Sequence, residues 1–405
     1  MGRFTIPRDV YHGEDALATL KTLEGKKAMV CYGGGSIERN GNLDKILSYL
    51  KEAGLETEIF NGIEPDPSVE TVMRGAEAMR KFEPDWIIAI GGGSPIDASK
   101  AMWVKYEHPE ITFEDMCKIG ALPKLRQKSK FCAISTTSGT GTEVTSFAVI
   151  TNYDEGIKYP MADFQLTPDI AIVDPALVAS LPPKGVAHTG MDALTHCIEA
   201  YVSTNADDFT DPLAVFGILD IQKHLVKSYN GDMDSRAHMH NAQCIAGMSF
   251  SNASLGIVHS MAHKSGATFE DHGAHIIHGC ANAIYLTKVI QYNAKEKAAA
   301  ERYAQIADFM HLGGSSVDEK VELLVNAVRK FNDDLNIPQG LKNLDAKNLP
   351  AETGFIPEDV FLERLPDMAE RAVGDACTFT NPRPITPKQM EELYKCCYYD
   401  TPVDF

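Results

Sequence analysis

The chain has 405 residues, of which 44% are hydrophobic and 23% are charged. That length is typical of two or three folded domains, and that composition excludes collagen-like, low-complexity and small disulfide-stabilised proteins. The 56 acidic side chains outnumber the 38 basic ones and leave a net charge of −18, which argues against nucleic acid and anionic membranes as partners.

The cysteines and the first residues of the chain indicate a cytoplasmic protein. The nine cysteines show no disulfide-like spacing, and a chain of this size needs no disulfide bonds to fold. Residues 1–10 lack the apolar segment of a secretory signal. No run of about 18 apolar residues occurs, so we expect no membrane span.

The first part of the chain alternates between strand-like and helix-like segments. Continuous apolar runs such as 86–90 are typical of parallel strands buried on both faces, and the apolar spacing within 43–50 and 69–76 predicts helices. The expected strands are 26–32, 56–63, 86–90, 131–137 and 171–174, with a hairpin over 147–161. This order predicts an α/β domain with a parallel sheet over residues 1–183.

The pattern changes after Leu181-Pro182-Pro183. Beyond that point apolar residues recur at helical spacing, and strand-like runs almost disappear. The expected helices are 190–202, 212–228, 234–250, 255–268, 280–292, 298–310 and 317–335. We therefore expect an all-α domain over residues 184–405.

A glycine-rich turn, Gly91–Ser94, lies between a predicted strand and a predicted helix. Ser94 is expected to cap the helix, Pro95 to take its first position and Asp97 to complete a capping box. A helix N-terminus there would present free N–H groups that suit a pyrophosphate, so the α/β domain is expected to bind a dinucleotide. The candidate cofactor residues are Gly92, Gly93, Ser94 and Asp97, with Lys100 as a nearby positive charge.

A second glycine-rich turn, Gly33–Ser36, follows the first predicted core strand. Many NAD enzymes present an acidic side chain to the adenosine ribose at this place. The turn itself has no acid, and Arg39 lies just beyond it, next to Glu38. Glycine N–H groups, a hydroxyl and a guanidinium could accept a 2′-phosphate, which favours NADP(H) over NAD(H). The candidate residues are Gly34, Gly35, Ser36 and Arg39.

A third candidate loop, Ser135–Thr145, follows another predicted strand and is rich in hydroxyl groups and glycine. Such a loop can hold phosphate and nicotinamide amide groups through many short donors.

Two acid or histidine pairs are spaced four residues apart in predicted helices. These are Asp192 with His196, and His259 with His263. That spacing places both members on one helix face, about 6 Å apart. The residue after His259 is Ser260 and not Glu, so the HExxH metalloprotease motif lacks its general base.

Three further histidines, His272, His275 and His278, follow the second pair. Imidazole and carboxylate donors without thiolate suit Fe(II) or Zn(II), so the helical domain is expected to bind a metal ion. The remaining histidines are predicted to be structural: His188, His238 and His240 lack a partner at ligand spacing, and His12, His108, His224 and His311 are expected to have no role in the chemistry.

Several motifs together resemble the iron-containing (group III) alcohol dehydrogenases over nearly the whole chain. They are GGGSPIDASK at 91–100, TTSGTGTEVT at 136–145, GMDALTHCIEAYVS at 190–203, GIVHSMAHKSGA at 256–267, HGCANAIYL at 278–286 and TNPRP at 380–384. The segment YGGGSIERNG at 32–41 is similar to the NADPH-dependent butanol dehydrogenase and aldehyde reductase branch.

The resemblance implies an N-terminal dinucleotide-binding domain, a C-terminal helical metal domain, an active site in the cleft and a homodimer or larger assembly. It implies iron as the metal and Asp192, His196, His259 and His278 as its ligands. His263 matches a family histidine near the nicotinamide and substrate. The segment before His278 is longer than is usual in the family, so His272 and His275 stay open as substitutes. The residues implied to line the cofactor cleft are Thr136, Thr137, Ser138, Thr145 and Lys158.

The expected reaction is reversible hydride transfer between NAD(P)H and a small primary alcohol or aldehyde. The metal would act on the substrate oxygen, Asp192 would moderate its charge and His263 would relay a proton. The alternative is a dehydroquinate-synthase-like or polyol-phosphate enzyme on the same fold. Its phosphorylated substrates would require clustered Lys and Arg near the metal, where the sequence offers only Lys264.

Overall fold

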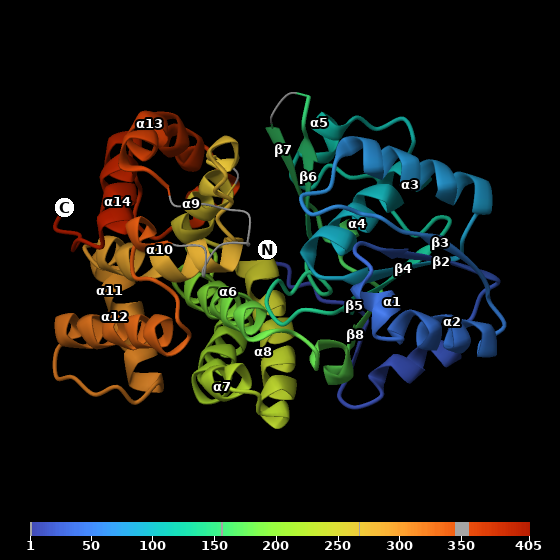
Figure 1. Ribbon diagram of the computed structural model, residues 1–405, viewed down its shortest axis with the longest axis horizontal. Helices are drawn as coiled ribbons and strands as arrows, with labels where there is room; N and C mark the ends of the chain where they lie inside the picture. Colours follow the sequence, from blue (N-terminus) through green and yellow to red (C-terminus); the bar gives the residue numbers. More distant parts are fainter. Residues whose placement is uncertain (1, 155–156, 267, 345–355) are drawn as a thin grey trace. The chain divides into compact units, whose positions relative to one another are not determined.

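The computed structural model describes residues 2–154, 157–266, 268–344 and 356–405. The chain divides into two compact units, Met1–Ser180 and Leu181–Phe405 (Figure 1). None of the helices in the described residues is long and apolar enough to cross a lipid bilayer.

The first unit is built on a six-stranded parallel sheet. Its strands are β1 (Asp9–His12), β2 (Lys27–Tyr32), β3 (Glu56–Phe60), β4 (Trp86–Gly91), β5 (Lys130–Ser135) and β8 (Ile170–Val173), in the spatial order β1-β8-β5-β4-β2-β3. All five pairings are parallel, which confirms the predicted α/β architecture. The edge strand β1 was not predicted, because four half-exposed residues carry no apolar run.

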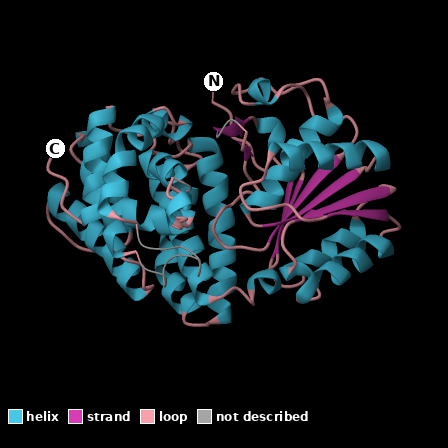
Figure 2. Ribbon diagram, turned by 45° about the horizontal axis from the view of Figure 1, so that its top comes forward, coloured by secondary structure: helices cyan, strands magenta, loops and turns pink. Residues whose placement is uncertain are grey.

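Helices cover both faces of this sheet (Figure 2). They are α1 (Ser36–Arg39), α2 (Asn42–Glu52), α3 (Val69–Phe82), α4 (Gly93–Glu107) and α5 (Phe113–Met116), with 3-10 turns η1 (Ala16–Thr22), η2 (Phe164–Leu166) and η3 (Pro175–Val178). Met29 of β2 enters a core with residues of α3 and α4, whereas Val30 enters a separate core with residues of α2. Because both faces are buried, the inner strands β2, β4, β5 and β8 are almost continuously apolar.

The predicted hairpin is confirmed. Strands β6 (Phe147–Asn152) and β7 (Ile157–Ala162) pair antiparallel, from Phe147 opposite Ala162 to Asn152 opposite Ile157. Part of its predicted turn, residues 155–156, lies outside the described residues.

The second unit consists of helices. They are α6 (Pro183–Val202), α7 (Asp211–Tyr229), α8 (Met233–Ala253), α9 (Ile257–Ser265), α10 (His278–Asn293), α11 (Lys297–Phe309), α12 (Val317–Asp334), α13 (Glu358–Val373) and α14 (Pro387–Tyr399), with 3-10 turns η4 (Glu270–His272), η5 (Leu341–Asn343) and η6 (Ala376–Thr380). The seven predicted helices are present, with α6 starting seven residues earlier than expected. Helices α13 and α14 were not predicted, and α13 contains Pro366, a residue that usually ends helices.

Candidate metal centre and cofactor loops

Three helices of the second unit bring three imidazoles to one carboxylate oxygen. Helix α6 carries Asp192 and His196 on one face, α9 contributes His259, and α10 begins at His278. The Nε2 atoms of His196, His259 and His278 lie 3.7, 3.6 and 3.5 Å from Asp192 Oδ1. Asp192, His196 and His259 are almost fully buried, whereas the His278 side chain is 39% exposed.

These donors fit a divalent iron or zinc ion. Ligand atoms about 2.1 Å from one ion lie about 3.4 Å from each other in a tetrahedral site, close to the separations seen here. Burial on its own would raise the pKa of Asp192, but the neighbouring imidazoles outweigh burial and hold it well below its ordinary value. The carboxylate is therefore charged and ready to neutralise a cation.

Asn282, one turn along α10 from His278, faces the same cluster. Its Nδ2 donates to Asp192 Oδ1 at 2.7 Å and lies 3.2 Å from His259 Nε2 and 3.1 Å from His278 Nε2. Its Oδ1 is buried and has no hydrogen-bond partner in the described part of the chain. An amide nitrogen packed against a carboxylate oxygen and two ring nitrogens, with its own oxygen unpaired, indicates a place for a cation among these atoms.

Glu199 is a site residue that sequence reasoning missed. Its Oε2 lies 2.5 Å from His259 Nδ1, and its Oε1 accepts from the N–H of Val258 at 2.8 Å. Burial would lower the pKa of His259, but Glu199 and Asp192 raise it to about 9. A carboxylate on Nδ1 orients Nε2 towards Asp192, which is the usual outer arrangement around a metal-bound histidine. Glu199 follows Asp192 by seven residues, so its place on the same helix face was the available signal.

His263 is paired with the carboxylate of Asp375, whose side chain is 9% exposed. Its Nδ1 lies 3.3 Å from Asp375 Oδ2, and its ring stacks on that of His278 with centroids 5.4 Å apart. Lys264 also reaches Asp375 Oδ2, at 2.8 Å. Burial opposes the charge on Asp375, but His263 and Lys264 keep its pKa well below the ordinary value. No local pattern could have indicated this pairing, because Asp375 lies 112 residues from His263.

The two open alternatives to His278 have surroundings of their own. The exposed His272 has its Nε2 3.8 Å from Asp271 Oδ2. His275 is half-buried and follows the isolated bridge between Phe269 and Ala274. Of the three candidates, the geometry brings only His278 to Asp192 among the interactions of the described residues.

In the first unit, the three candidate cofactor loops follow neighbouring strands. Strand β4 lies between β2 and β5 in the sheet, and the carboxyl ends of parallel strands meet at one edge. The chain leaves β2 towards β3 on one side and returns to β4 on the other. Loops 33–36 and 91–93 therefore flank the point where the strand order reverses, which is where dinucleotides bind in open α/β sheets.

Glycines in these loops let the backbone segments approach closely. A Cβ on Gly33 would lie 2.7 Å from the Ile63 carbonyl oxygen, and one on Gly92 would lie 3.1 Å from the Thr137 side chain. Gly91 has φ +152° and packs on the ring of Pro95. In contrast, nothing lies within 4 Å of the same position on Gly34, so its backbone stays accessible.

The predicted capping box at this helix is wrong. Helix α4 begins at Gly93, and its N-cap, Gly92, makes no side-chain hydrogen bond. Asp97 instead accepts from Thr142 Oγ1 at 2.7 Å and from the N–H of Val149 at 3.1 Å. The carboxylate turns away from the helix start because its partners lie elsewhere, Thr142 on the hydroxyl-rich loop and Val149 on β6.

Lys100 is also not the free positive charge that the sequence suggested. It is fully buried, and its Nζ donates to the carbonyls of Thr142, Thr145 and Phe147 at 2.8–2.9 Å and lies 3.2 Å from Thr145 Oγ1. Burial lowers the pKa of Lys100 to about 8. Lys100 and Asp97 thus hold the hydroxyl-rich loop 135–145 against α4 by hydrogen bonds, and Thr145 accepts from Lys100 in this contact.

Other candidates in the loops differ in their surroundings. Thr136 donates its N–H to the Gly91 carbonyl at 2.9 Å, while Ser138 is buried. Thr137 Oγ1 is buried without a hydrogen-bond partner in the described residues, so it is a free acceptor and donor for a ligand. The exposed Arg39 side chain extends back over the 33–36 turn: its Nη1 lies 3.1 Å from the position that a Cβ on Gly35 would take.

Two charged residues near the expected nucleotide site, Glu38 and Lys158, are already paired with other side chains. Glu38 Oε1 accepts from the Tyr32 hydroxyl at 2.5 Å, which ties this acid to β2. Lys158 on β7 forms an ion pair with Asp66 Oδ1 at 2.8 Å. Ser36 begins the short helix α1.

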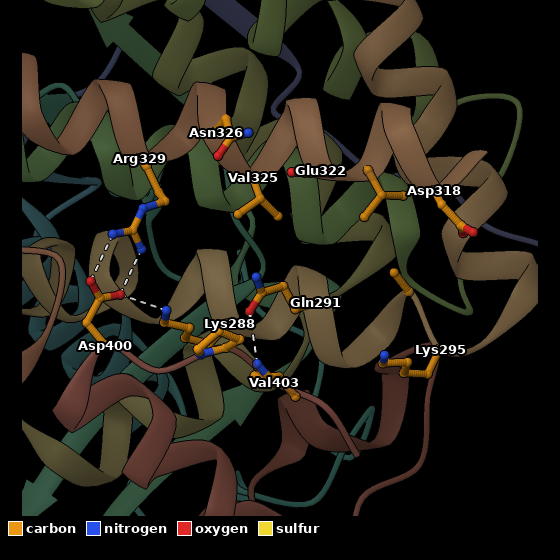
Figure 3. Close-up of a pocket in the computed structure, with 13 residues that line it drawn as sticks. Lys288, Gln291, Lys295, Asp318, Glu322, Val325, Asn326, Arg329, Asp400 and Val403 are labelled. Carbon is orange, nitrogen blue, oxygen red and sulfur yellow. Dashed lines mark hydrogen bonds and ion pairs between the residues drawn. The ribbon is translucent and has the colours of Figure 1, made fainter. Parts of the chain in front are cut away.

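A pocket of about 560 Å³ lies elsewhere on the helical unit (Figure 3). Arg329 and Lys288 point towards Asp400 and pair with it at 2.7 Å. Lys288 follows His278 by ten residues on α10, about 15 Å along the helix. None of the cluster around Asp192 lines this pocket.

Comparisons with known proteins agree with this architecture. The family model described as iron-containing alcohol dehydrogenase matches residues 7–175, and the model of the C-terminal part of that family matches residues 186–398. The chain is 56% identical over 405 residues to the NADPH-dependent butanol dehydrogenase of Clostridium saccharobutylicum, with all of both chains covered.

Two further relatives are more distant. The chain is 39% identical to the bifunctional aldehyde-alcohol dehydrogenase AdhE of Escherichia coli, where 97% of this chain covers 46% of that protein. It therefore spans about half the length of that relative. The solved iron-containing alcohol dehydrogenase of Thermococcus thioreducens superposes with a TM-score of 0.87 at 32% identity, covering 98% of this chain and all of the other.

Family models match both halves of the chain, and a relative is 56% identical over the full length of both proteins. The protein belongs to the iron-containing alcohol dehydrogenase family and is an oxidoreductase that interconverts alcohols and aldehydes.

Proposed function

We propose that the protein transfers hydride reversibly between NADP(H) and a small primary alcohol or aldehyde, with an iron ion at the Asp192 cluster. The convergence of three histidine Nε2 atoms on Asp192 Oδ1 carries this proposal. A short linear alcohol such as butanol is the proposed substrate class, supported by the name of the relative that is 56% identical.

The proposed metal ligands are Asp192, His196, His259 and His278. The same four donors suit zinc, so iron rests on the family rather than on the ligands. When bound, the ion supplies Lewis acidity to the substrate oxygen. Asp192 contributes the negative charge that moderates that acidity, and Glu199 holds His259 in orientation.

His263 is the proposed proton relay for the alcohol oxygen. Asp375 binds its Nδ1, which leaves Nε2 to exchange a proton with the substrate side. Asp192 and His263 are thus the proposed catalytic side chains, and Asp375 is a positioning residue for His263.

The glycine and hydroxyl loops are the proposed cofactor site of a dinucleotide-binding domain at residues 1–183. Backbone N–H groups at Gly34, Gly35, Gly92 and Gly93 would hold phosphate oxygens. Arg39 would pair with the 2′-phosphate, supported by its place over Gly35. The other proposed cofactor residues are Ser36, Ser94, Asp97, Thr136, Thr137, Ser138, Thr145 and Lys158, with Asp97 and Thr145 acting through the loop that they fasten.

Residues 184–405 are the proposed metal and catalytic domain. A homodimer or larger assembly is proposed by similarity to the family. A cytoplasmic location is proposed from the nine free cysteines, since a reducing compartment keeps thiols unpaired.

The lyase and polyol-phosphate alternative is not favoured by the surroundings of the metal cluster. Such substrates carry a phosphate that requires unpaired cations. The nearby Lys264 is already bound to Asp375.

Steady-state reduction of butanal, followed by nicotinamide absorbance, tests the proposal. We expect a higher kcat/KM with NADPH than with NADH. The variant Arg39→Ala should raise the KM for NADPH about tenfold, the loss of one charge-assisted contact of roughly 1.4 kcal/mol, and leave the KM for NADH nearly unchanged. Arg74→Ala, an exposed arginine of α3, is the matched control. Equal use of NADH by the wild type would contradict the NADP(H) preference, and no butanal-dependent oxidation would contradict the substrate class.

A further inference from the structure

A second group of metal-binding residue types lies on helices α7 and α8, which pack against each other (Figure 1). Asp220 and His224 are one turn apart on α7, and His238 faces them from α8. His224 Nε2 lies 3.6 Å from Asp220 Oδ1, and His238 Nδ1 lies 3.3 Å from Asp220 Oδ2. One donor atom from each residue falls within 4.8 Å of the others. The group shares no residue with the Asp192 cluster.

The buried member of this group has an unused ring nitrogen. His224 is only 7% exposed, and its Nε2 has no hydrogen-bond partner within the described residues. Its Nδ1 lies 3.0 Å from Ser235 Oγ. When Nδ1 donates its proton to that hydroxyl, Nε2 presents a lone pair towards Asp220, as a metal-bound histidine does.

We propose that Asp220, His224 and His238 form a second site for a divalent transition metal, of the zinc class, on the surface of the helical unit. Two imidazoles and one carboxylate are three donors of the type that zinc uses, with water in the fourth position. The separations of 3.6 and 3.3 Å, each to a different oxygen of Asp220, are already close to the spacing of about 3.4 Å between ligands of one tetrahedral ion.

One side chain must turn to complete this site. The rings of His224 and His238 stack with centroids 4.0 Å apart and planes 2° apart, and an ion binds in the plane of an imidazole ring. The His238 side chain is 50% exposed, so rotation about its side-chain bonds meets little packing resistance. The buried His224 and the half-buried Asp220 then form the fixed part of the site, and His238 completes it.

Zinc counting on the untagged full-length protein tests this proposal. After equilibration at about 0.1 mM free Zn²⁺ and pH 7, we expect two ions per wild-type chain and one per His238→Gln chain. Asp220→Asn should also lose one ion. The matched control is His12→Gln, since His12 is an exposed histidine of the other unit, and it should keep two ions.

The variant His238→Gln is expected to fold and to keep alcohol dehydrogenase activity, because its side chain lies half in solvent and outside the proposed catalytic cluster. Its thermal unfolding without added zinc should match the wild type. The proposal is overturned if the wild type and His238→Gln bind the same number of ions. It is also overturned if the lost ion proves to be the one that activity requires.

Discussion

At the scale of single residues, the candidate metal centre contains three carboxylates with little exposure, and each of them contacts at least one imidazole. Three histidine Nε2 atoms lie within 3.7 Å of Asp192 Oδ1. Glu199 contacts Nδ1 of His259, and Asp375 contacts Nδ1 of His263. The sequence predicted the four-residue pairs because one helix turn brings them together whatever the rest of the fold does. It could not reveal Asp375, because a contact across 112 residues has no local signature.

The role of Glu199 predicts a specific change in metal affinity. Glu199→Gln keeps the size and one acceptor of the side chain but removes the charge that raises the basicity of His259. We expect the affinity for Zn²⁺ to fall about 10–100-fold, the usual effect of losing such a partner. Competition with a fluorescent chelator measures this directly, without depending on turnover.

Glu301→Gln is the matched control, because Glu301 is an exposed acid of α11. Equal chelator competition by Glu199→Gln and the wild type would show that the Glu199 carboxylate does not support the metal ligand.

At the scale of elements, close packing of helices decides where the ligands lie. Helix α10 was expected to begin near Cys280 and instead begins at His278. A Cβ on Gly279 would lie 2.1 Å from the carbonyl oxygen of His188 on α6. Only a glycine lets α10 approach α6 closely enough to bring His278 to Asp192.

Gly279→Ala should therefore separate α10 from α6. The contact involves backbone on both sides, so no side chain can simply turn away. We expect a loss of about 1–3 kcal/mol in stability, as for other overpacked interiors, together with lower zinc content after dialysis. Thermal unfolding and metal analysis provide the two measurements.

Gly374→Ala is the matched control at a helix end. Its added Cβ would meet only the carbonyl oxygens of Arg371 and Glu370, at 3.7 and 3.8 Å, which are ordinary contacts. If Gly279→Ala unfolds at the same temperature and keeps the same metal content as Gly374→Ala, the close approach does not control the site.

At the scale of the whole molecule, the metal cluster belongs to one unit alone. Asp192, His196, His259 and His278 all lie in Leu181–Phe405, whereas the sheet and glycine loops lie in Met1–Ser180. Each unit also has its own hydrophobic clusters. Stabilisation by the ion should therefore be confined to the helical unit.

Metal removal provides a test of that confinement by hydrogen exchange. A ligand that binds only the folded state stabilises it by RT ln(1 + L/Kd), where L is the free ligand concentration. Removing the ion with a chelator should speed amide exchange in α6, α9 and α10 and leave β2, β4 and β5 unchanged. Equal acceleration in both units would show that the ion supports the whole chain.

The sequence by itself determined the fold class, the parallel strands around the glycine loops, most helices and the pairs within one helix turn. These features depend on apolar periodicity and on spacing along the chain, which are local. Only the tertiary structure decided which strand is the neighbour of which, that Lys100 fastens a loop instead of meeting phosphate, and that Glu199 and Asp375 hold two histidines. It also brought His238 of α8, expected to be structural, to the Asp220–His224 pair of α7. These outcomes depend on helices and strands meeting across long sequence separations, where burial and close packing select the partner.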